Sequence, residues 1–252
     1  MLELKVISVC LATFNGEKYI FEQLNSILDQ IGPYDEVIIS DDNSTDRTID
    51  IIHGFNDSRV KVYFNNNDKE KRALIYNNVY YVNRNFSNAL EHASGDIIFL
   101  SDQDDIWLDG KVRANIEALK KADLVVSNCL IFDDLDKNPS ESYFDIIRPS
   151  FNFYRTIYKS SFHGCCMAFR KEVLETALPL PNSFIGHDTW IGLVASKFYT
   201  VSFLFKPLVM YRRHELAVTT SSKRSTRPLW NKLLYRINLL YYFYVRFYRK
   251  VL

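Results

Sequence analysis

The segment from Ser101 to Trp107, with the sequence SDQDDIW, contains three carboxylates within four residues and directly follows the apolar run 97–100. A buried strand that ends in such a cluster is destabilised unless the carboxylates face water or bind a cation. The spacing lets two of the three carboxylates reach one hard metal ion and leaves coordination positions for phosphate oxygens. The segment therefore predicts a divalent-metal site that also holds phosphate.

Polar side chains also follow the first two apolar runs of the chain. Thr13 and Asn15 come after the first run, and Asp41 and Asp42 come after the second. Ligands of open α/β sheets bind beyond the carboxyl ends of the strands. Each pair alone is typical of an ordinary turn or a helix cap. Together with the acidic cluster, the two pairs indicate one shared ligand site.

The sequence lacks both common glycine-rich phosphate motifs, G-x-G-x-x-G and G-x-x-x-x-G-K-S/T. A metal ion on carboxylates is then the natural way to hold phosphate. Magnesium or manganese would bridge the two phosphates of a nucleoside diphosphate and stabilise the charge on this group as it leaves. We therefore expect Mn²⁺ or Mg²⁺ as the cofactor.

Three segments resemble one known family: Val9–Gly16 (VCLATFNG), Ile39–Asp46 (ISDDNSTD) and Leu100–Trp107 (LSDQDDIW). They resemble the family 2 glycosyltransferases of the GT-A fold, and the form D-Q-D-D-x-W is most similar to the bacterial rhamnosyltransferase-type branch. The resemblance covers roughly residues 5–215. It implies a metal-dependent inverting transfer of a sugar from a UDP- or dTDP-sugar to a hydroxyl of a glycan acceptor in surface-polysaccharide assembly. The branch favours rhamnose as the transferred sugar.

The order of the elements is consistent with that fold, because strands alternate with helices along the chain. We expect an α/β protein with a single Rossmann-like, mostly parallel sheet flanked by helices and a C-terminal helical tail. Residues 1–215 would form the catalytic domain and residues 216–252 the tail. Strands are predicted at 6–11, 36–40, 59–64, 96–100, 124–132, 164–170 and 200–211, and helices at 17–30, 46–55, 86–93, 111–121, 171–177, 188–196 and from 225 onward. The segment 65–85 is interpreted as a surface loop with a helical turn, 133–138 as an acidic turn, and 142–161 stays unassigned.

The resemblance implies which residues bind the donor nucleotide. Thr13, Phe14 and Glu17 would surround the base and ribose, and Asp42 would accept a hydrogen bond from a uracil or thymine imide. Arg84 and Asn85 have the appearance of a nucleotide-side contact, although the link before them is longer than in relatives and lacks glycine. The complete donor-binding set is Thr13, Phe14, Asn15, Glu17, Asp41, Asp42, Arg84, Asn85, Asp102 and Gln103.

The resemblance also assigns the metal ligands. Asp104 would bind the metal directly, and Asp102 would lie nearer the ribose or the water shell of the metal. The segment Tyr211–His214 resembles a late motif in which a histidine returns to the metal, which makes His214 a third ligand and leaves Arg212 or Arg213 for phosphate. The alternative interpretation of this segment is a basic surface turn.

The segment Gly186–Trp190 (GHDTW) contains the candidate catalytic residue. A carboxylate just before a helix is by default a helix cap, whereas the matching aspartate of the family is the catalytic base. Inverting transfer needs one carboxylate to take the proton of the acceptor hydroxyl, and we assign this role to Asp188. His187 occupies a position that often holds a second acid in relatives.

The C-terminal tail is basic and aromatic. No acidic residue follows Glu215. On a continuous helix, Lys232, Arg236, Arg246 and Lys250 would share one stripe, which is interrupted by apolar residues. Such a helix fits an anionic membrane surface. The alternative is a terminal helix packed on the catalytic domain, with its basic residues on the outer face.

Composition limits the remaining possibilities. The net charge of +1 argues against nucleic-acid binding. The four cysteines have neither zinc-site nor disulfide spacing, which is typical of reduced thiols in a cytosolic protein. No signal peptide is predicted, and no uncharged run approaches the roughly 20 residues that span a bilayer. We expect a cytoplasmic protein that is peripheral at the inner face of the cell membrane and acts on a lipid-linked acceptor.

Two other functions compete with this interpretation. A sugar nucleotidyltransferase has a related fold but needs a glycine-rich N-terminal loop with basic residues, which this sequence lacks. The other competitor is a non-catalytic, membrane-associated module that binds nucleotide or glycan. Release of the nucleotide from a donor sugar would separate an enzyme from such a module.

Overall fold

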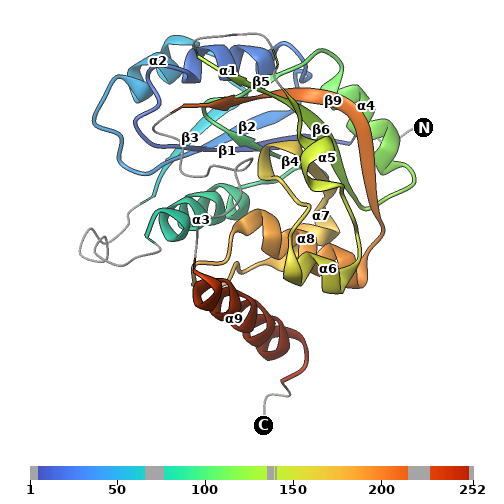
Figure 1. The fold of residues 1–252 in the computed structure, drawn as a ribbon. Helices are drawn as coiled ribbons and strands as arrows, with labels where there is room; N and C mark the ends of the chain where they lie inside the picture. Colours follow the sequence, from blue (N-terminus) through green and yellow to red (C-terminus); the bar gives the residue numbers. More distant parts are fainter. Residues whose placement is uncertain (1–4, 66–76, 135–138, 140, 215–227, 250–252) are drawn as a thin grey trace.

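The computed structural model describes residues 5–65, 77–134, 139, 141–214 and 228–249. These residues form one curved sheet with helices on both faces (Figure 1). In spatial order the strands are β3 (Val60–Phe64), β2 (Glu36–Asp41), β1 (Ile7–Thr13), β4 (Ile97–Asp102), β8 (Met167–Arg170), β6 (Leu124–Asp133), β9 (Val201–Arg213) and β5 (Ile106–Trp107), with β7 (Glu141–Ser142) paired to β6. The predicted α/β fold is confirmed.

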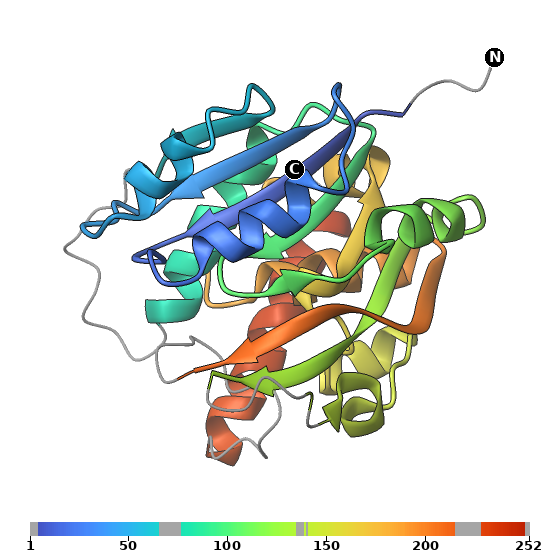
Figure 2. The ribbon, with the colours of Figure 1, turned by 90° about the horizontal axis from the view of Figure 1, so that it is seen from above.

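The sheet has two parts that differ in strand direction. Strands β3, β2, β1 and β4 are all parallel, as in a Rossmann-like half. Strand β8 is antiparallel to both β4 and β6, whereas the long pair β6 and β9 is parallel. The view from above shows this pair on the side of the sheet away from β3 (Figure 2). The central strands read as continuous apolar runs because helices cover both of their faces.

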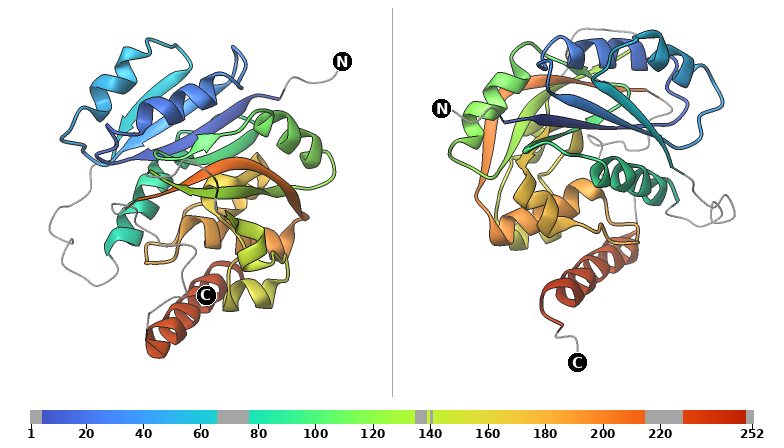
Figure 3. Two further views of the ribbon diagram at one scale, coloured as in Figure 1. Left: turned by 45° about the horizontal axis from the view of Figure 1, so that its top comes forward. Right: turned by 180° about the vertical axis from the view of Figure 1, so that it is seen from behind.

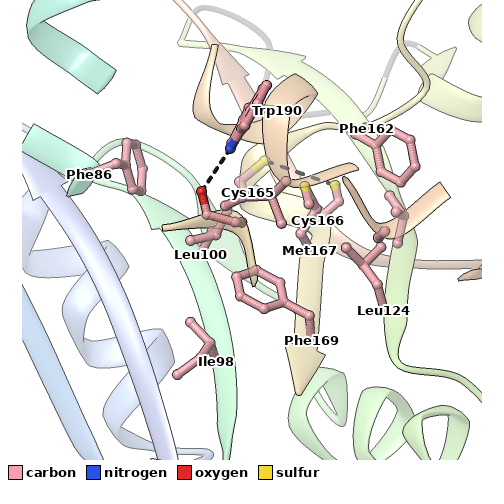
Figure 4. Packing of buried hydrophobic residues seen from close by; sticks show 14 of the residues in the cluster. Phe86, Ile98, Leu100, Leu124, Phe162, Cys165, Cys166, Met167, Phe169 and Trp190 are labelled. Atoms are coloured by element: carbon pink, nitrogen blue, oxygen red, sulfur yellow. Dashed lines mark hydrogen bonds between the residues drawn. The ribbon is translucent and has the colours of Figure 1, made fainter. Parts of the chain in front are cut away.

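Helices divide between the two faces and bury two apolar clusters. One face carries α1 (Ile20–Leu28), α2 (Thr48–Gly54) and α4 (Lys111–Leu119), and the other carries α3 (Asn77–Glu91), α5 (Tyr143–Ile147), α6 (Phe153–Tyr158), α7 (Lys171–Ala177) and α8 (His187–Phe198). The second cluster includes Phe86, Phe169 and Trp190 (Figure 4). The Trp190 indole donates a hydrogen bond to the Ala177 carbonyl at 2.8 Å, so α7 and α8 are fixed to each other. All four cysteines are free and buried, as expected.

Helix α3 begins earlier than predicted. The expected helix started at residue 86, with a loop before it, but the helix extends from Asn77 to Glu91. Residues 66–76 of the predicted loop lie outside the described residues. The sequence pattern is obscured because Asn83 and Asn85, which are both buried, occupy positions on the inner face where apolar residues would have revealed a helical period.

Strand β5 and the helices within the segment 142–161 were not predicted. The two residues of β5 pair antiparallel with β9, Ile106 opposite Met210 and Trp107 opposite Val209. A strand of two residues produces no detectable periodicity. Its pairing brings the acidic cluster next to the end of β9. The last part of the predicted acidic turn, residues 135–138, lies outside the described residues.

The last helix, α9 (Leu229–Phe247), lies against α6 and α8 on the side of the molecule away from α1 and α2 (Figure 3). Residues 215–227, which contain the predicted boundary between the two domains and the predicted start of this helix, lie outside the described residues. None of the helices in the described part of the chain combines the length and apolarity required to cross a bilayer.

Candidate active site

The carboxyl ends of β1, β2 and β4 meet at one edge of the sheet. In the parallel register, Thr13 lies opposite Asp41, and Ala12 lies opposite Asp102. The polar residues that follow three separate apolar runs of the sequence therefore lie side by side. The sequence-based expectation of a shared edge is correct for these positions.

A network of hydrogen bonds fixes the loops after β1 and β2. The Thr13 hydroxyl donates to Asp41 Oδ2 at 2.9 Å, and the backbone amide of Ser44 donates to Asp41 Oδ1 at 2.8 Å. Across the two loops, Asn15 Oδ1 accepts from the amide of Thr45 at 2.8 Å. The buried Asp41 carboxylate thus holds the two loops together and has few open positions for a ligand.

Gln103, from the acidic segment, binds the loop after β1. Its Oε1 accepts from the Phe14 amide at 2.9 Å, and its Nε2 donates to the Phe14 carbonyl at 3.1 Å. A Cβ at Gly16 would collide with this amide group, so a larger residue there would have to displace the Gln103 side chain from the loop. The Phe14 ring, directly after the end of β1, is 42% exposed.

The remaining predicted donor residues differ in position. Asn85 Nδ2 donates to the Thr13 carbonyl at 2.9 Å, and Asp42 is buried beside it with its amide bonded to the same carbonyl at 3.0 Å. Arg84 is exposed on α3. Glu17 Oε2 accepts from the amide of Arg47, which precedes α2, at 3.0 Å. The Glu17 carboxylate therefore supports a helix end.

His214 contacts the acidic cluster, although it lies 110 positions after Asp104 in the sequence. Its Nε2 lies 2.7 Å from Asp104 Oδ2, and its Nδ1 is buried without a hydrogen-bond partner. The pairing of β5 with β9 produces this contact, and the Arg212 amide strengthens it by donating to Asp105 Oδ1 at 3.0 Å. Because the His214 side chain is only 9% exposed, the alternative of a basic surface turn is wrong.

The two arginines before His214 have different surroundings. The Arg212 guanidinium donates to Glu22 Oε2 at 2.5 Å and to Asp134 Oδ1 at 2.9 Å, and it lies over the Tyr19 ring. The Arg212 guanidinium therefore already binds other protein groups. Arg213 instead has its Nε and one terminal nitrogen buried without partners. Of the two, Arg213 is therefore the one with donors available to a phosphate.

Electrostatics place Asp188 in the same environment as the acidic cluster. Burial and, to a smaller extent, the charges of Asp104 and Asp188 together raise the pKa of Asp102 to about 8. Carboxylates that oppose each other's ionisation in this way are a common feature of metal and catalytic sites. A divalent cation would relieve the repulsion.

The residues present fit a divalent metal. Two carboxylates and the imidazole of His214 are ligand types that Mn²⁺ accepts, and the oxygens also suit Mg²⁺. The Asp104–His214 contact already places two of these ligands together. Among the described residues, the group of three ligand atoms that lie within 4.8 Å of one another is that of Asp102, Asp105 and Cys165, so the predicted set Asp102, Asp104 and His214 is not gathered within that distance. Burial raises the pKa of Asp105 well above its ordinary value, as it does for Asp102.

Asp188 lies in the first turn of α8. Its Oδ1 accepts from the amide of Thr189 at 2.5 Å. The neighbouring His187 ring stacks on Phe86 with centroids 3.8 Å apart, and burial lowers its pKa to about 4. A Cβ at Gly164 would lie 3.0 Å from His187 Nε2, so this glycine allows η2 (Gly164–Cys166) to approach the start of α8 closely.

Sequence reasoning missed the aromatic residues beside Asp188. The His163 ring stacks on Tyr143 and meets the edge of Tyr211, with both centroid distances at 4.7 Å. Burial raises the pKa of Tyr143 well above its ordinary value, and the charge of Asp188 adds to the shift. Tyr143 belongs to the unassigned segment 142–161, and no local motif distinguishes it there.

Comparisons with known sequences agree with the geometry. Residues 8–178 match the sequence profile of the family described as Glycosyl transferase family 2. The dTDP-rhamnosyl transferase RfbG of Shigella flexneri is 28% identical, covering 81% of this chain and 72% of its own. The UDP-Glc:alpha-D-GlcNAc-diphosphoundecaprenol beta-1,3-glucosyltransferase WfgD of Escherichia coli is 28% identical, covering 90% and 85%. The GalNAc(5)-diNAcBac-PP-undecaprenol beta-1,3-glucosyltransferase of Campylobacter jejuni is 25% identical, covering 85% and 68%.

Solved structures share the fold. Staphylococcus aureus TarS 1–349 in complex with UDP-GlcNAc superposes with a TM-score of 0.66 at 18% identity, and the match covers 94% of this chain and 66% of that one. Glucosyl-3-phosphoglycerate synthase from Mycobacterium tuberculosis, in complex with Mn²⁺, UDP and phosphoglyceric acid, gives a TM-score of 0.57 at 20% identity, covering 96% and 78%. At these identities the similarity concerns the fold alone.

Proposed function

The chain belongs to glycosyl transferase family 2, and from this premise we propose that it is a metal-dependent inverting enzyme of bacterial polysaccharide biosynthesis. It is a glycosyltransferase. It transfers a sugar from a nucleotide-sugar donor to a hydroxyl group of a glycan acceptor. The contact between His214 and Asp104 carries the proposal, because it joins the end of β9 to the acidic cluster and creates a ligand pair that neither segment contains alone.

In this proposal Asp104 and His214 hold the metal, and Asp102 is the third predicted ligand. When bound, Mn²⁺ or Mg²⁺ neutralises charge on the diphosphate that leaves the donor. Arg213 offers further positive charge, since two of its nitrogens are buried without partners.

Asp188 acts as the general base. It takes the proton of the acceptor hydroxyl while the acceptor oxygen forms a bond to the anomeric carbon and the bond from that carbon to the diphosphate oxygen breaks. Attack from the face opposite the leaving group inverts the anomeric configuration. The leaving diphosphate needs no proton from a second carboxylic acid, which agrees with a single acidic residue in the first turn of α8.

The donor is a UDP- or dTDP-sugar. The imide of uracil or thymine would donate to Asp42, and the exposed Phe14 ring would lie against the base. Rhamnose is the proposed sugar because RfbG is named a dTDP-rhamnosyl transferase. A lipid-linked acceptor is proposed because the two glucosyltransferase relatives are named for diphosphoundecaprenol and PP-undecaprenol substrates.

We also propose that the protein works in the cytoplasm, at the inner face of the cell membrane, because a lipid-linked acceptor is presented there. Nucleic acid is not a partner in this proposal, since the chain has a net charge of only +1. The division into a catalytic domain (1–215) and a tail (216–252) stays a prediction.

A donor screen tests the proposal. The purified protein is incubated with UDP-glucose, UDP-GlcNAc or dTDP-rhamnose and Mn²⁺, Mg²⁺ or EDTA, with water or an added glycan as the acceptor, and released UDP or dTDP is measured. We expect one donor to release nucleotide with Mn²⁺ or Mg²⁺ and none to do so in EDTA. Donor binding without release would identify a non-catalytic module, and pyrophosphate release from a nucleoside triphosphate would identify a nucleotidyltransferase. Undiminished release in EDTA would overturn the metal assignment.

A further inference from the structure

Helix α9 is attached to the catalytic body by aromatic residues on one side. Leu239 and Phe243 are its buried residues. The Phe243 ring lies 5.1 Å from Phe153 of α6 and 6.0 Å from Phe198 of α8, measured between centroids. Trp190 also stacks on Phe247 at 6.2 Å. This side of the helix is therefore an ordinary packed interface.

Arg236 and Arg246 of the predicted basic stripe lie on this same packed side, which corrects the alternative in which the basic residues form the outer face; Lys250 lies outside the described residues. Arg236 donates to the Tyr158 carbonyl at 3.0 Å and lies over the Tyr158 ring at 4.4 Å. Arg246 donates to the Leu178 carbonyl. At 100° per residue, both arginines fall within about 60° of Leu239 and Phe243. Their positive charges hold the helix to backbone carbonyls of the body.

The opposite side of α9 is apolar and exposed. Its large apolar side chains are between 40% and 84% exposed and follow helical spacing: Leu229, Trp230, Leu233, Leu234, Ile237, Leu240, Tyr241, Tyr244 and Tyr248. No charged residue lies among them on this face. A surface helix of a soluble protein has the reverse arrangement. Contiguous apolar faces of this kind mark a surface that binds something.

The positive charge of the C-terminal segment indicates what binds to the exposed apolar face of α9. Residues 216–252 contain no Asp or Glu, and their Lys and Arg residues are Lys223, Arg224, Arg227, Lys232, Arg236, Arg246, Arg249 and Lys250. A second copy of the chain on this face would bring two strongly basic segments together, which is unfavourable. An anionic lipid surface complements them. Trp230 and three tyrosines on the apolar face are residue types that concentrate at the boundary between headgroups and acyl chains.

We infer that α9 inserts its apolar face into the interfacial layer of an anionic membrane leaflet and so docks the enzyme on its lipid-linked acceptor. This inference rests on the proposed function for the nature of the acceptor. Helix α8 connects the two sites: Asp188 lies in its first turn, and Trp190, two residues later, packs on α9. The Tyr242 hydroxyl also donates to the carbonyl of Asn182, in the segment before α8, at 3.3 Å.

Vesicle flotation tests this inference with the full chain. The probes are vesicles of phosphatidylcholine alone and of phosphatidylcholine with phosphatidylglycerol, each at low and high salt. The triple variant Leu233→Gln, Ile237→Gln, Leu240→Gln makes the apolar face polar without touching the packed side. We expect wild type to bind the anionic vesicles, to retain part of this binding at high salt, and to bind at least tenfold more tightly than the triple variant.

A matched control removes exposed aromatic residues elsewhere. The variant Phe21→Gln, Tyr34→Gln alters side chains that are 62% and 80% exposed at α1 and in the segment before β2, and it should bind vesicles as wild type does. Equal binding by wild type and the triple variant, or no binding by either, would overturn the inference. So would a wild-type dimer in sedimentation analysis that the triple variant converts to a monomer.

Nucleotide release separates this inference from the proposed function. The triple variant should release donor nucleotide in vesicle-free solution at the wild-type rate, because its substitutions lie on the exposed face of α9. A wild type that floats with vesicles but releases no nucleotide contradicts the proposed function alone. A wild type that releases nucleotide but does not float contradicts the docking surface alone.

Discussion

The two halves of the candidate site differ in how many of their polar side-chain atoms have hydrogen-bond partners within the protein. In the β1–β2 half, the side chains of Thr13, Asn15, Asp41 and Gln103 all bind other protein groups. In the half formed by η2, α8 and the end of β9, several buried nitrogens have no hydrogen-bond partner: His163 Nε2, His187 Nε2, Arg213 Nε and His214 Nδ1. Buried polar atoms without partners are rare in folded proteins.

This difference indicates different tasks. The β1–β2 half is preorganised, because its loops keep their shape without a ligand, and rigid positioning is what a nucleotide-binding edge requires. The other half contains the candidate base and metal ligands and leaves donors and acceptors that a metal, a diphosphate or a sugar can satisfy. Mutations should therefore reduce activity most in the second half and alter donor binding only mildly in the first.

The substitution Asp188→Asn is expected to have the largest effect. Removal of a general base reduces turnover by about 10²–10⁴-fold, whereas donor and metal affinity should change little because the amide has the same shape. Transfer rate and donor-dependent thermal shift would be measured in parallel. Asp50→Asn, an exposed carboxylate on α2, is the control. Wild-type turnover in Asp188→Asn would remove the assignment of the base.

The substitution His214→Gln should next weaken metal binding. Changes to outer-shell partners alone cost about 10–100-fold in metal affinity, so loss of the ligand itself should cost at least as much. Mn²⁺ titration of nucleotide release would give the apparent affinity. His53→Gln, on the exposed last turn of α2, should titrate as wild type. Equal Mn²⁺ affinity in both variants would show that His214 is no ligand.

His187 should make stability depend on pH. Burial lowers its pKa from 6.5 to about 4, while Asp188 acts in the opposite direction and His163 adds a smaller lowering. Between these two pKa values the unfolded chain binds more protons, so stability falls as pH falls from about 6.5 to 4. At pH 5 the loss from this group is about 2 kcal/mol relative to pH 7.

Urea unfolding at pH 7 and pH 5 measures this loss. Carboxylates contribute their own pH dependence, so the informative quantity is the difference between wild type and His187→Gln at each pH. We expect the variant to lose about 2 kcal/mol less than wild type over this interval. Equal losses in the two proteins would mean that the folded state leaves His187 free to titrate.

The sequence predicted the first half of the site better than the second. Thr13, Asp41 and Asp102 directly follow continuous apolar runs, and parallel strands necessarily align their ends, so short segments were sufficient to place them. The His214–Asp104 contact depends on β5, whose two residues have no periodicity. It was expected only from family resemblance.

The C-terminal helix shows why pattern alone fails at surfaces. The spacing of Lys232, Arg236 and Arg246 correctly indicated one stripe, but the interruptions, Leu239 and Phe243, mark the buried side of the helix. Charge predicted the outer face and apolar packing determined the inner one, because an arginine can lay its apolar stem along the packed side while its guanidinium donates to carbonyl groups of the body. Periodicity gives the angle between residues and leaves open which side meets the protein.

The substitution Gln103→Ala should produce the smallest effect. It removes two hydrogen bonds to the Phe14 backbone at a partly exposed position, so the free energy of unfolding should fall by about 1 kcal/mol. Because we expect Gln103 to act by holding the loop after β1, the donor KM should rise a few-fold with kcat unchanged. Asn25→Ala, which removes an exposed hydrogen bond within α1, should leave KM unaffected. A drop in kcat would place Gln103 among the groups that act on the donor itself. Gln103 would then not belong to a half of the site that only positions the nucleotide, and the proposed difference between the two halves would be wrong for this residue.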